Sequence, residues 1–174
     1  MATCFRLTFF VFLVFITNAT TAQYNSTPVF RLGGAIAFGL SHMASNNIGI
    51  GGMAGAEKLF SKSFAAELET SYTYFTGDKT YYMDGRNKAF TAPLLAGIKA
   101  YPLRNVYGSL RTGAVYFLLN GMSSARVSLG YGAAGGINLP RSNNRLNLQI
   151  SYTGFRFEGI SRGYTTLAAA IIIR

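Results

Sequence analysis

Alternation of apolar and polar residues is the feature that most constrains the fold of this chain. Residues 146–152 read LNLQISY, so every second side chain is apolar over the length of a strand. Successive side chains of an extended strand point to opposite faces, and such a segment therefore has one apolar and one polar face. The same pattern recurs in segments 64–76, 89–101 and 126–139. We therefore expect an all-β fold.

The alternation, together with the turn residues between the segments, predicts eight strands. They span residues 31–40, 47–58, 64–76, 89–101, 106–118, 126–139, 145–156 and 164–173. Most of these segments are 10–14 residues long. A soluble strand usually has about five or six residues, whereas a tilted strand needs about 9–11 to cross a bilayer. The predicted lengths therefore fit a membrane-crossing sheet.

The connections between the predicted strands alternate in length. Short ones such as PLRN at 102–105 separate longer ones such as TGDKTYYMDGRNK at 76–88 and EGISRG at 158–163. Short turns at one end and longer loops at the other are typical of an up-and-down outer-membrane barrel. An even number of strands would return both ends of the barrel to the periplasmic side.

The composition favours lipid as the surroundings of the apolar face. Only 13% of the residues are charged, about half the usual share of a soluble domain, and the mean hydropathy is +0.23. No long apolar run follows the N-terminal segment. In hydrocarbon only helices and closed barrels satisfy all backbone polar groups. We therefore predict an eight-stranded, antiparallel, up-and-down transmembrane β-barrel in the cell outer membrane.

The N-terminal residues 1–22 have the form of a secretory signal peptide. Arg6 precedes an apolar stretch from Leu7 to Ile16, and small or polar residues follow up to Ala22. A membrane anchor would need about 20 apolar residues, roughly twice this run. We expect cleavage after Ala22 and a single barrel domain over residues 23–174. The only cysteine, Cys4, would be removed with the signal.

The basic excess, with 16 Lys and Arg against 6 Asp and Glu, is spread over the ends of the segments. Nucleic-acid binding usually needs a clustered patch or stripe, and we expect no nucleic-acid partner. One histidine and no mature cysteine leave only scattered carboxylates as metal ligands. We therefore expect neither a metal site nor a cofactor.

The interior of an eight-stranded barrel is barely wide enough for its own side chains. The alternation places five charged residues on the inward face: Glu57, Glu67, Glu69, Lys99 and Arg111. Buried charges persist when they are paired, and an internal ion-pair network is therefore predicted. Inward glycines, of which Gly55 is one, would leave room for these long side chains.

Two further features concern the barrel wall. Pro93 lacks the N–H that a closed ladder requires and should mark a bulge. Tyrosines near strand ends suit aromatic girdles at the membrane interfaces, although ordinary β-propensity also favours tyrosine. They are Tyr72, Tyr74, Tyr101, Tyr107, Tyr116, Tyr152 and Tyr164.

The chain resembles the small outer-membrane β-barrel family of the OmpA/OmpX type, and more narrowly the outer-membrane barrel proteins of Bacteroidota. The signal ending TTAQ, the rhythm of eight strands across 23–174 and the last strand GYTTLAAAIIIR carry this resemblance. It implies insertion into a Gram-negative outer membrane by the barrel-assembly machinery, which reads the last strand. Such strands usually end in an aromatic residue, whereas this one ends at Arg174. We expect a monomer.

Candidate catalytic residues are few. His42 lies beside Ser41 in the first predicted outer loop, and Asp78 lies in the second. Some eight-stranded barrels modify lipid A with a histidine, a hydroxyl and an acid near the outer rim, as acyltransferases or deacylases. Such chemistry needs a base that activates a hydroxyl or water. A single histidine in a loop is more often a solvated polar residue, and we expect no enzymatic activity.

The outer surface offers two candidate contact regions. The longest loop carries Lys79, Tyr81, Tyr82, Met83, Arg86 and Lys88, and the apolar side chains at its tip suit a partner or surface ligand. At the outer strand ends, Arg126, Arg156 and Arg162 could pair with lipopolysaccharide phosphates. The alternatives are a plain extended hairpin and simple solvation of the charges.

These observations predict a non-enzymatic barrel with a filled lumen and outer loops that form a contact surface, in a structural or surface-interaction role. Outer-membrane lipid and lipopolysaccharide are its expected partners. A lipid A-modifying enzyme, a narrow porin-like pore and an accessory barrel of a secretion system remain open as alternatives.

Overall fold

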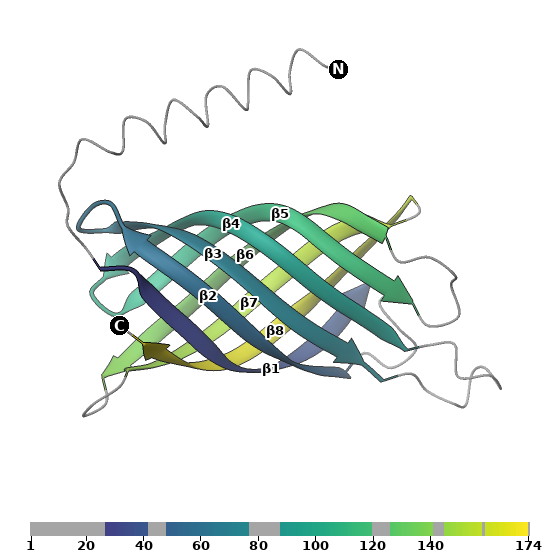
Figure 1. The fold of residues 1–174 in the computed structure, drawn as a ribbon, viewed down its shortest axis with the longest axis horizontal. Helices are drawn as coiled ribbons and strands as arrows, with labels where there is room; N and C mark the ends of the chain where they lie inside the picture. Colours follow the sequence, from purple (N-terminus) through teal and green to yellow (C-terminus); the bar gives the residue numbers. More distant parts are fainter. Residues whose placement is uncertain are drawn as a thin grey trace, which may run out of the picture.

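The computed structural model describes residues 27–41, 48–76, 88–119, 126–140, 145–157 and 159–173. Its eight strands form one closed antiparallel barrel in which each strand pairs with its neighbours in sequence and β8 pairs with β1 (Figure 1). The strands are β1 (Val29–Ser41), β2 (Ile48–Leu59), β3 (Phe64–Phe75), β4 (Ala89–Leu103), β5 (Val106–Leu119), β6 (Arg126–Pro140), β7 (Arg145–Phe157) and β8 (Ile160–Ile173). The predicted fold class is confirmed.

Seven of the predicted strands agree with the observed ones to within two residues at each boundary, and β8 is the exception. It begins at Ile160 instead of residue 164, and Phe157 pairs with Ile160 across the hairpin. Gly159 has a φ of 81° there, a conformation that glycine adopts without steric cost. The expected longer connection at 158–163 was therefore wrong, because most of it belongs to the strand.

The barrel has two distinct ends. At one, which we call the terminal end, β1 begins, β8 finishes and the turns at 60–63 and 104–105 join β2 to β3 and β4 to β5 (left in Figure 1). At the other, the loop end, β1 finishes and β2 begins, and β3 and β5 also finish. Residues of the longest predicted loop, 77–87, lie outside the described part of the chain.

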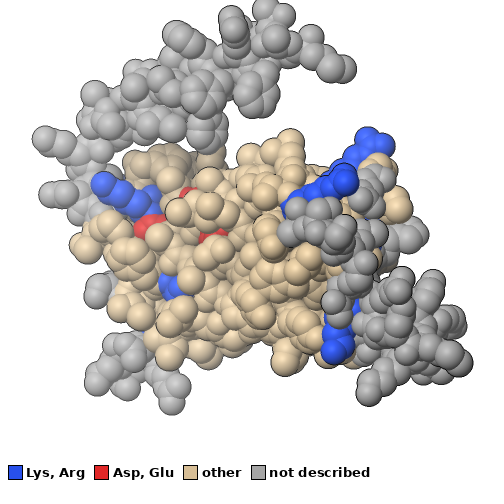
Figure 2. Space-filling model, turned by 45° about the vertical axis from the view of Figure 1, so that its right-hand side comes forward, with Lys and Arg blue, Asp and Glu red and all other residues tan. Residues whose placement is uncertain are grey.

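The outer wall is apolar over most of its height. Side chains such as Leu110 and Leu129 are 74–79% exposed, while their neighbours Ser109, Arg111 and Gly130 are buried. Figure 2 shows basic side chains near the two ends of the molecule and a broad uncharged band between them. In water this band would be unfavourable, whereas acyl chains are a suitable solvent for it. Among the described residues, no helix has the length and hydropathy to cross a membrane.

The wall contains no bulge at Pro93. Pro93 pairs with Val115 on β5 without a change of register, and the β3–β4 register is the same on both sides of it. The hydroxyl of Thr70 donates to the Pro93 carbonyl at 2.9 Å. The predicted bulge was wrong, because the ladder tolerates the missing N–H by leaving out the pairs at Ser71 and Tyr72. The register changes occur elsewhere, near Gly39 and near Ala100.

The tyrosines divide between the two faces. Tyr72 and Tyr116 lie on the outer wall near the loop end, where their ring centroids are 4.6 and 5.8 Å from that of Phe90. Tyr107 and Tyr164 are buried inside the barrel, and the hydroxyl of Tyr101 reaches Glu57 inside it. An interfacial girdle therefore cannot include these three, since their rings or hydroxyls serve the interior.

Candidate functional site in the barrel interior

The inward side chains at the terminal end form a charged network. It consists of three cations and three carboxylates from five strands: Arg31, Glu57, Glu67, Glu69, Lys99 and Arg111. Each has at most 9% of its surface exposed. Because the numbers of positive and negative groups are equal, the network adds no net charge to the barrel interior.

Most of the ion pairs join strands that are not neighbours in the sheet. Lys99 Nζ donates to Glu57 Oε2 at 2.5 Å and lies 3.2 Å from Glu67 Oε2. Arg31 Nη2 donates to the same Glu67 oxygen at 3.1 Å and lies 3.5 Å from Glu69 Oε2. Arg111 Nη1 donates to Glu69 Oε1. Since carboxylates bridge successive cations, removal of one would leave two charges without a full set of partners.

The structure brings together all five charged residues that the alternation placed inside. It adds Arg31, whose guanidinium contacts all three carboxylates and is 2% exposed as a residue. The sequence contains the signal that could have identified it. Phe30, Leu32 and Ile36 face outward on β1, so the same alternation points Arg31 inward.

Neutral polar groups complete the network. Gln149 accepts from Arg31 at 2.9 Å through its oxygen, and its amide donates to both oxygens of Glu69 at 3.1 Å. The Tyr107 hydroxyl donates to the Gln149 oxygen at 2.8 Å. Lys99 Nζ lies 4.1 Å from the Tyr107 ring centroid, within cation–π range. These groups satisfy many of the hydrogen bonds that the charges would otherwise lose on burial.

Glycines opposite the charged side chains make space for them. A Cβ on Gly55 would lie 3.2 Å from Arg31 Nη2, and one on Gly97 would lie 2.7 Å from Arg111 Cγ. Gly97 pairs directly with Arg111, and Gly55 with Glu69. A larger residue at Gly97 would therefore displace the arginine stem or the strand itself.

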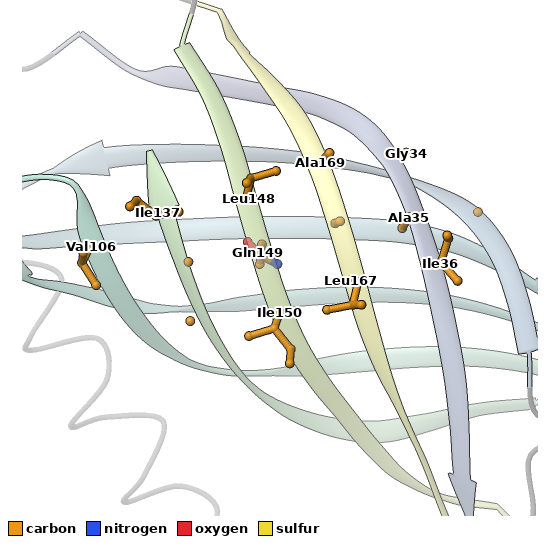
Figure 3. A pocket seen from close by; sticks show the side chains of 14 residues that line it. Gly34, Ala35, Ile36, Val106, Ile137, Leu148, Gln149, Ile150, Leu167 and Ala169 are labelled. Carbon is orange, nitrogen blue, oxygen red and sulfur yellow. The ribbon is translucent and has the colours of Figure 1, made fainter. Parts of the chain in front are cut away.

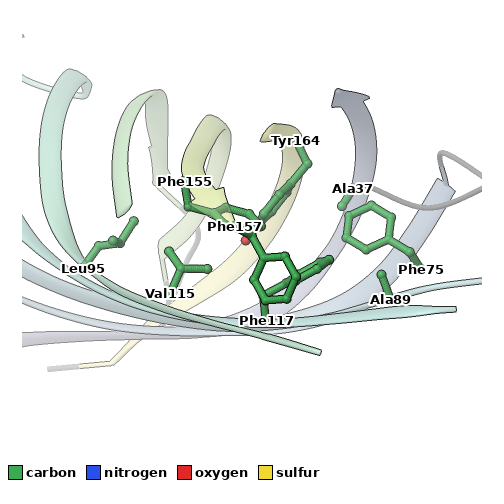
Figure 4. Close-up of a cluster of buried hydrophobic side chains, with 9 residues drawn as sticks. All are labelled: Ala37, Phe75, Ala89, Leu95, Val115, Phe117, Phe155, Phe157 and Tyr164. Carbon is green, nitrogen blue, oxygen red and sulfur yellow. The ribbon is translucent and has the colours of Figure 1, made fainter. Parts of the chain in front are cut away.

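The inward side chains at the loop end are mostly aromatic, although a polar face was expected throughout. Phe75, Phe117, Phe155, Phe157 and Tyr164 are at most 2% exposed and pack against one another (Figure 4). Phe117 lies 5.2 Å from Phe155 and 4.9 Å from Phe157 between centroids. We call this group, with its aliphatic neighbours, the aromatic layer. The expectation of a uniformly polar interior was wrong, because a closed tube can be filled by apolar packing as well as by paired charges.

A small cavity lies between the network and the aromatic layer. Its volume is about 10 Å³, and hydroxyls of Ser71, Ser151, Thr153 and Thr166 line it together with Glu69. This volume is close to that of one water molecule. Met53, Leu95 and Ala168 also line the cavity. Its hydroxyls and the Glu69 carboxylate suit a single water, while a continuous file of waters would need far more room.

Arg162 also points into the barrel. Its guanidinium carbon lies 5.0 Å from the Phe117 centroid and 5.4 Å from that of Phe157, and the residue is 9% exposed. Arg162 was predicted as a lipopolysaccharide contact, but this position faces the interior, and the prediction was therefore wrong. Arg126 and Arg156 are exposed at the loop end. Arg126 pairs directly with the inward-facing Phe117 and therefore lies at the rim of the lumen, whereas Arg156 lies at an outward position of β7.

The other predicted site residues lie largely outside the described part of the chain. His42 and Asp78 are among them, as are Lys79, Tyr81, Tyr82, Met83 and Arg86. Ser41 is the last residue of β1, and its side chain is not described. Lys88 is exposed just before β4. Within the described residues, no group of three or more histidine, cysteine or acidic side chains is arranged to hold a metal ion.

The closed eight-stranded fold is shared with barrels of known structure. The chain is similar to Neisserial surface protein A, with a TM-score of 0.61 and 16% identity over 85% of this chain and 97% of that protein. It is similar to Ail, the attachment invasion locus protein of Yersinia pestis, with a TM-score of 0.56 and 14% identity over 84% and 97%. A further structure of Ail contains the heparin analogue sucrose octasulfate.

A third similar structure is the outer membrane protein OprG from Pseudomonas aeruginosa. Its TM-score is 0.51, with 11% identity over 84% of this chain and 93% of that protein. No family model and no curated protein sequence matches the chain. At these identities the likeness extends to the fold alone: the chain has the closed eight-stranded architecture of small outer-membrane β-barrels.

Proposed function

We propose that this chain is an integral outer-membrane protein that crosses the bilayer with eight strands, has no enzymatic activity and presents its loop end as a contact surface. The observation that carries this proposal is the contrast between wall and interior. The wall exposes apolar side chains such as Leu129, at 79%, while six charged residues are buried and paired inside. Lipid outside and a filled lumen inside account for both.

The filling of the lumen supports a structural role over transport. The charged network and the aromatic layer occupy successive levels of the same tube, and the cavity between them measures about 10 Å³. A solute would have to displace paired charges or packed rings to pass. A narrow pore is therefore the less favoured alternative. We also propose that the chain is a monomer when the barrel-assembly machinery inserts it.

The loop end supports contact with anionic surfaces. Lys88, Arg126 and Arg156 are exposed there, and the described acidic residues all lie inside the barrel. Such cations form charge-assisted hydrogen bonds with phosphate or sulfate groups. The complex of Ail with sucrose octasulfate is a precedent for anion binding by a barrel of this fold. We propose lipopolysaccharide phosphates as the corresponding partner of this chain.

Conductance across a planar bilayer tests the proposed function directly. The refolded mature chain, checked for heat-modifiable migration on a gel, should give no steady single-channel currents, because neither layer of the lumen leaves room for ions. Stable, ion-selective steps would contradict the filled lumen and favour the pore.

Lipid A from cells that produce the chain should have the same mass as lipid A from cells that produce the His42→Ala variant. A mass change that depends on His42 would instead favour the lipid A-modifying enzyme.

A further inference from the structure

The outer wall contains a groove near the terminal end, across β3 to β6. Its volume is about 1170 Å³, and it is lined by Phe64, Ala96, Ile98, Ala100, Gly108 and Leu110, among others. A second wall groove of about 1030 Å³ crosses β6, β7, β8 and β1 (Figure 3). In Figure 3 the side chains of Ile36, Leu148 and Ile150 border that second groove. We call the two the β4–β5 groove and the β7–β8 groove.

The space above Gly108, at the floor of the β4–β5 groove, is not filled by any other part of the barrel. Gly108 pairs with Ala100 on one side and with Gly135 on the other. A Cβ on Gly108 would meet only one atom within 4 Å, the Ala134 carbonyl oxygen at 3.9 Å. Inward glycines such as Gly97 are different, because there a Cβ would collide with the backbone. A side chain at Gly108 would therefore point into the groove without disturbing the wall.

Two cations stand where the groove meets the terminal end. Lys62 lies in the turn just before Phe64, and Arg104 lies in the turn just after the groove-lining residue Pro102. Both are exposed. The Tyr101 N–H donates to the Ser63 carbonyl at 2.8 Å, which joins the turn that carries Lys62 to the end of β4, just before Arg104. The described carboxylates are all paired inside the barrel, so none of them neutralises these two cations.

The groove extends along the membrane normal over about the thickness of one lipid leaflet. It follows β4 from Ala96 to Pro102, which is roughly 20 Å of extended chain at about 3.3 Å per residue. With a strand tilt of about 40°, this length covers roughly 15 Å along the membrane normal, or half of a hydrocarbon core of about 30 Å. An apolar trough of this depth below a pair of cations complements an acyl chain attached to a phosphate.

We propose that the β4–β5 groove binds one anionic phospholipid of the periplasmic leaflet. An acyl chain lies along Ala100 and Gly108, and the phosphate pairs with Lys62 and Arg104. The groove is continuous with the lipid-facing wall, and the charge complementarity at its end selects an anionic headgroup over a zwitterionic one. This site rests on the proposed function, in which the loop end is the outer contact surface and the opposite, terminal end consequently faces the periplasm.

Native mass spectrometry of the folded chain, released from detergent micelles with added dioleoyl-phosphatidylglycerol, tests the site. We expect phosphatidylglycerol to form a one-to-one adduct with the chain. Dioleoyl-phosphatidylcholine should form the corresponding adduct with at least fivefold lower affinity. The double variant K62Q/R104Q should weaken the adduct by a similar factor, because it removes both phosphate contacts. Gly108→Leu should do the same by filling the trough. An excess of glycerol phosphate should not displace the lipid, since the acyl chain contributes to binding.

Gly52→Leu is the matched control, because Gly52 is another glycine of the outer wall and lines neither groove. It should leave the adduct unchanged. All variants must keep heat-modifiable migration, which shows that the barrel is folded. Full retention of phosphatidylglycerol by either the charge variant or Gly108→Leu would overturn the proposal. So would a two-chain species that Gly108→Leu abolishes, since the groove would then hold a second copy. The conductance test of the proposed function does not depend on lipid binding, so failure of the lipid site and failure of the filled lumen can be told apart.

Discussion

The two halves of the lumen lie within one closed sheet and follow the same inward-facing alternation, yet they are filled by opposite chemistry. Near the terminal end, Arg31, Glu67 and Lys99 meet within hydrogen-bond distance. Near the loop end, Phe117 and Phe157 pack face to edge. Both solutions fill a tube in which the cavity between the two layers has room for about one water. They differ in how they fail, because a broken ion pair leaves a charge buried, whereas a truncated ring leaves an empty volume.

A single substitution in the charged half of the lumen should lower the free energy of unfolding most. Glu69→Lys would place a fourth cation beside Arg31 and Arg111 and remove the carboxylate that pairs with both. We expect a loss of free energy of unfolding toward the upper end of about 3–5 kcal/mol, because the remaining charges stay buried. Urea unfolding of the barrel in lipid vesicles, followed by gel migration, measures this loss.

Lys58→Glu provides the control for that measurement. Lys58 is exposed on the outer side of β2 near the terminal end, and its reversal should change the stability by no more than about 0.5 kcal/mol. An unchanged urea midpoint for Glu69→Lys would show that the charged network does not stabilise the barrel.

The aromatic half should respond through lost packing. Phe117→Ala removes a ring that contacts Phe155 and Phe157 and that lies below the Arg162 guanidinium. A loss of about 3 kcal/mol is expected, in the range for buried phenylalanine truncations. The outward-facing Phe38→Ala is the control, because Phe38 is 39% exposed and acyl chains can fill the space that it leaves. If both variants unfold at the same urea concentration, the aromatic layer contributes no more than a ring exposed to lipid.

Two arginines at the loop end separate interior from surface effects. Arg162→Met keeps much of the apolar stem but removes the charge over two rings, and we expect a loss of about 1 kcal/mol in any lipid. Arg156→Met should change the stability by less than about 0.5 kcal/mol in phospholipid vesicles. Lipopolysaccharide in the vesicles should raise the free energy of unfolding of the wild type, and it should raise that of Arg156→Met by less.

Urea unfolding of both variants, in phospholipid vesicles and in vesicles that contain lipopolysaccharide, measures this difference between Arg162 and Arg156. If Arg162→Met became destabilising only with lipopolysaccharide, Arg162 would act on the surface after all. Equal behaviour of Arg156→Met in both lipids would argue against a phosphate contact at that position.

Much of the architecture could be predicted from local pattern. The two-residue period places Leu148 and Ile150 outside and Gln149 inside whatever the rest of the chain does, because successive side chains of a strand alternate. The same rule put Glu57, Glu67, Glu69, Lys99 and Arg111 on the inner face. The missed members follow the same rule: Arg31 and Phe117 lie at inward positions of their strands, but their importance depends on neighbours from distant strands.

The sequence by itself determined the number of strands, the bounds of seven of them to within two residues and the choice of an apolar exterior, because these depend on a period of two residues and on chain composition. Only the tertiary structure decided the partners. Arg31 and Glu67 are 36 residues apart, and Lys99 and Glu57 are 42 apart. Closure of the sheet and its register bring such pairs to one level of the tube, and no local pattern encodes that level. The same closure gathered five aromatic side chains at the loop end and turned Arg162 inward over two of them.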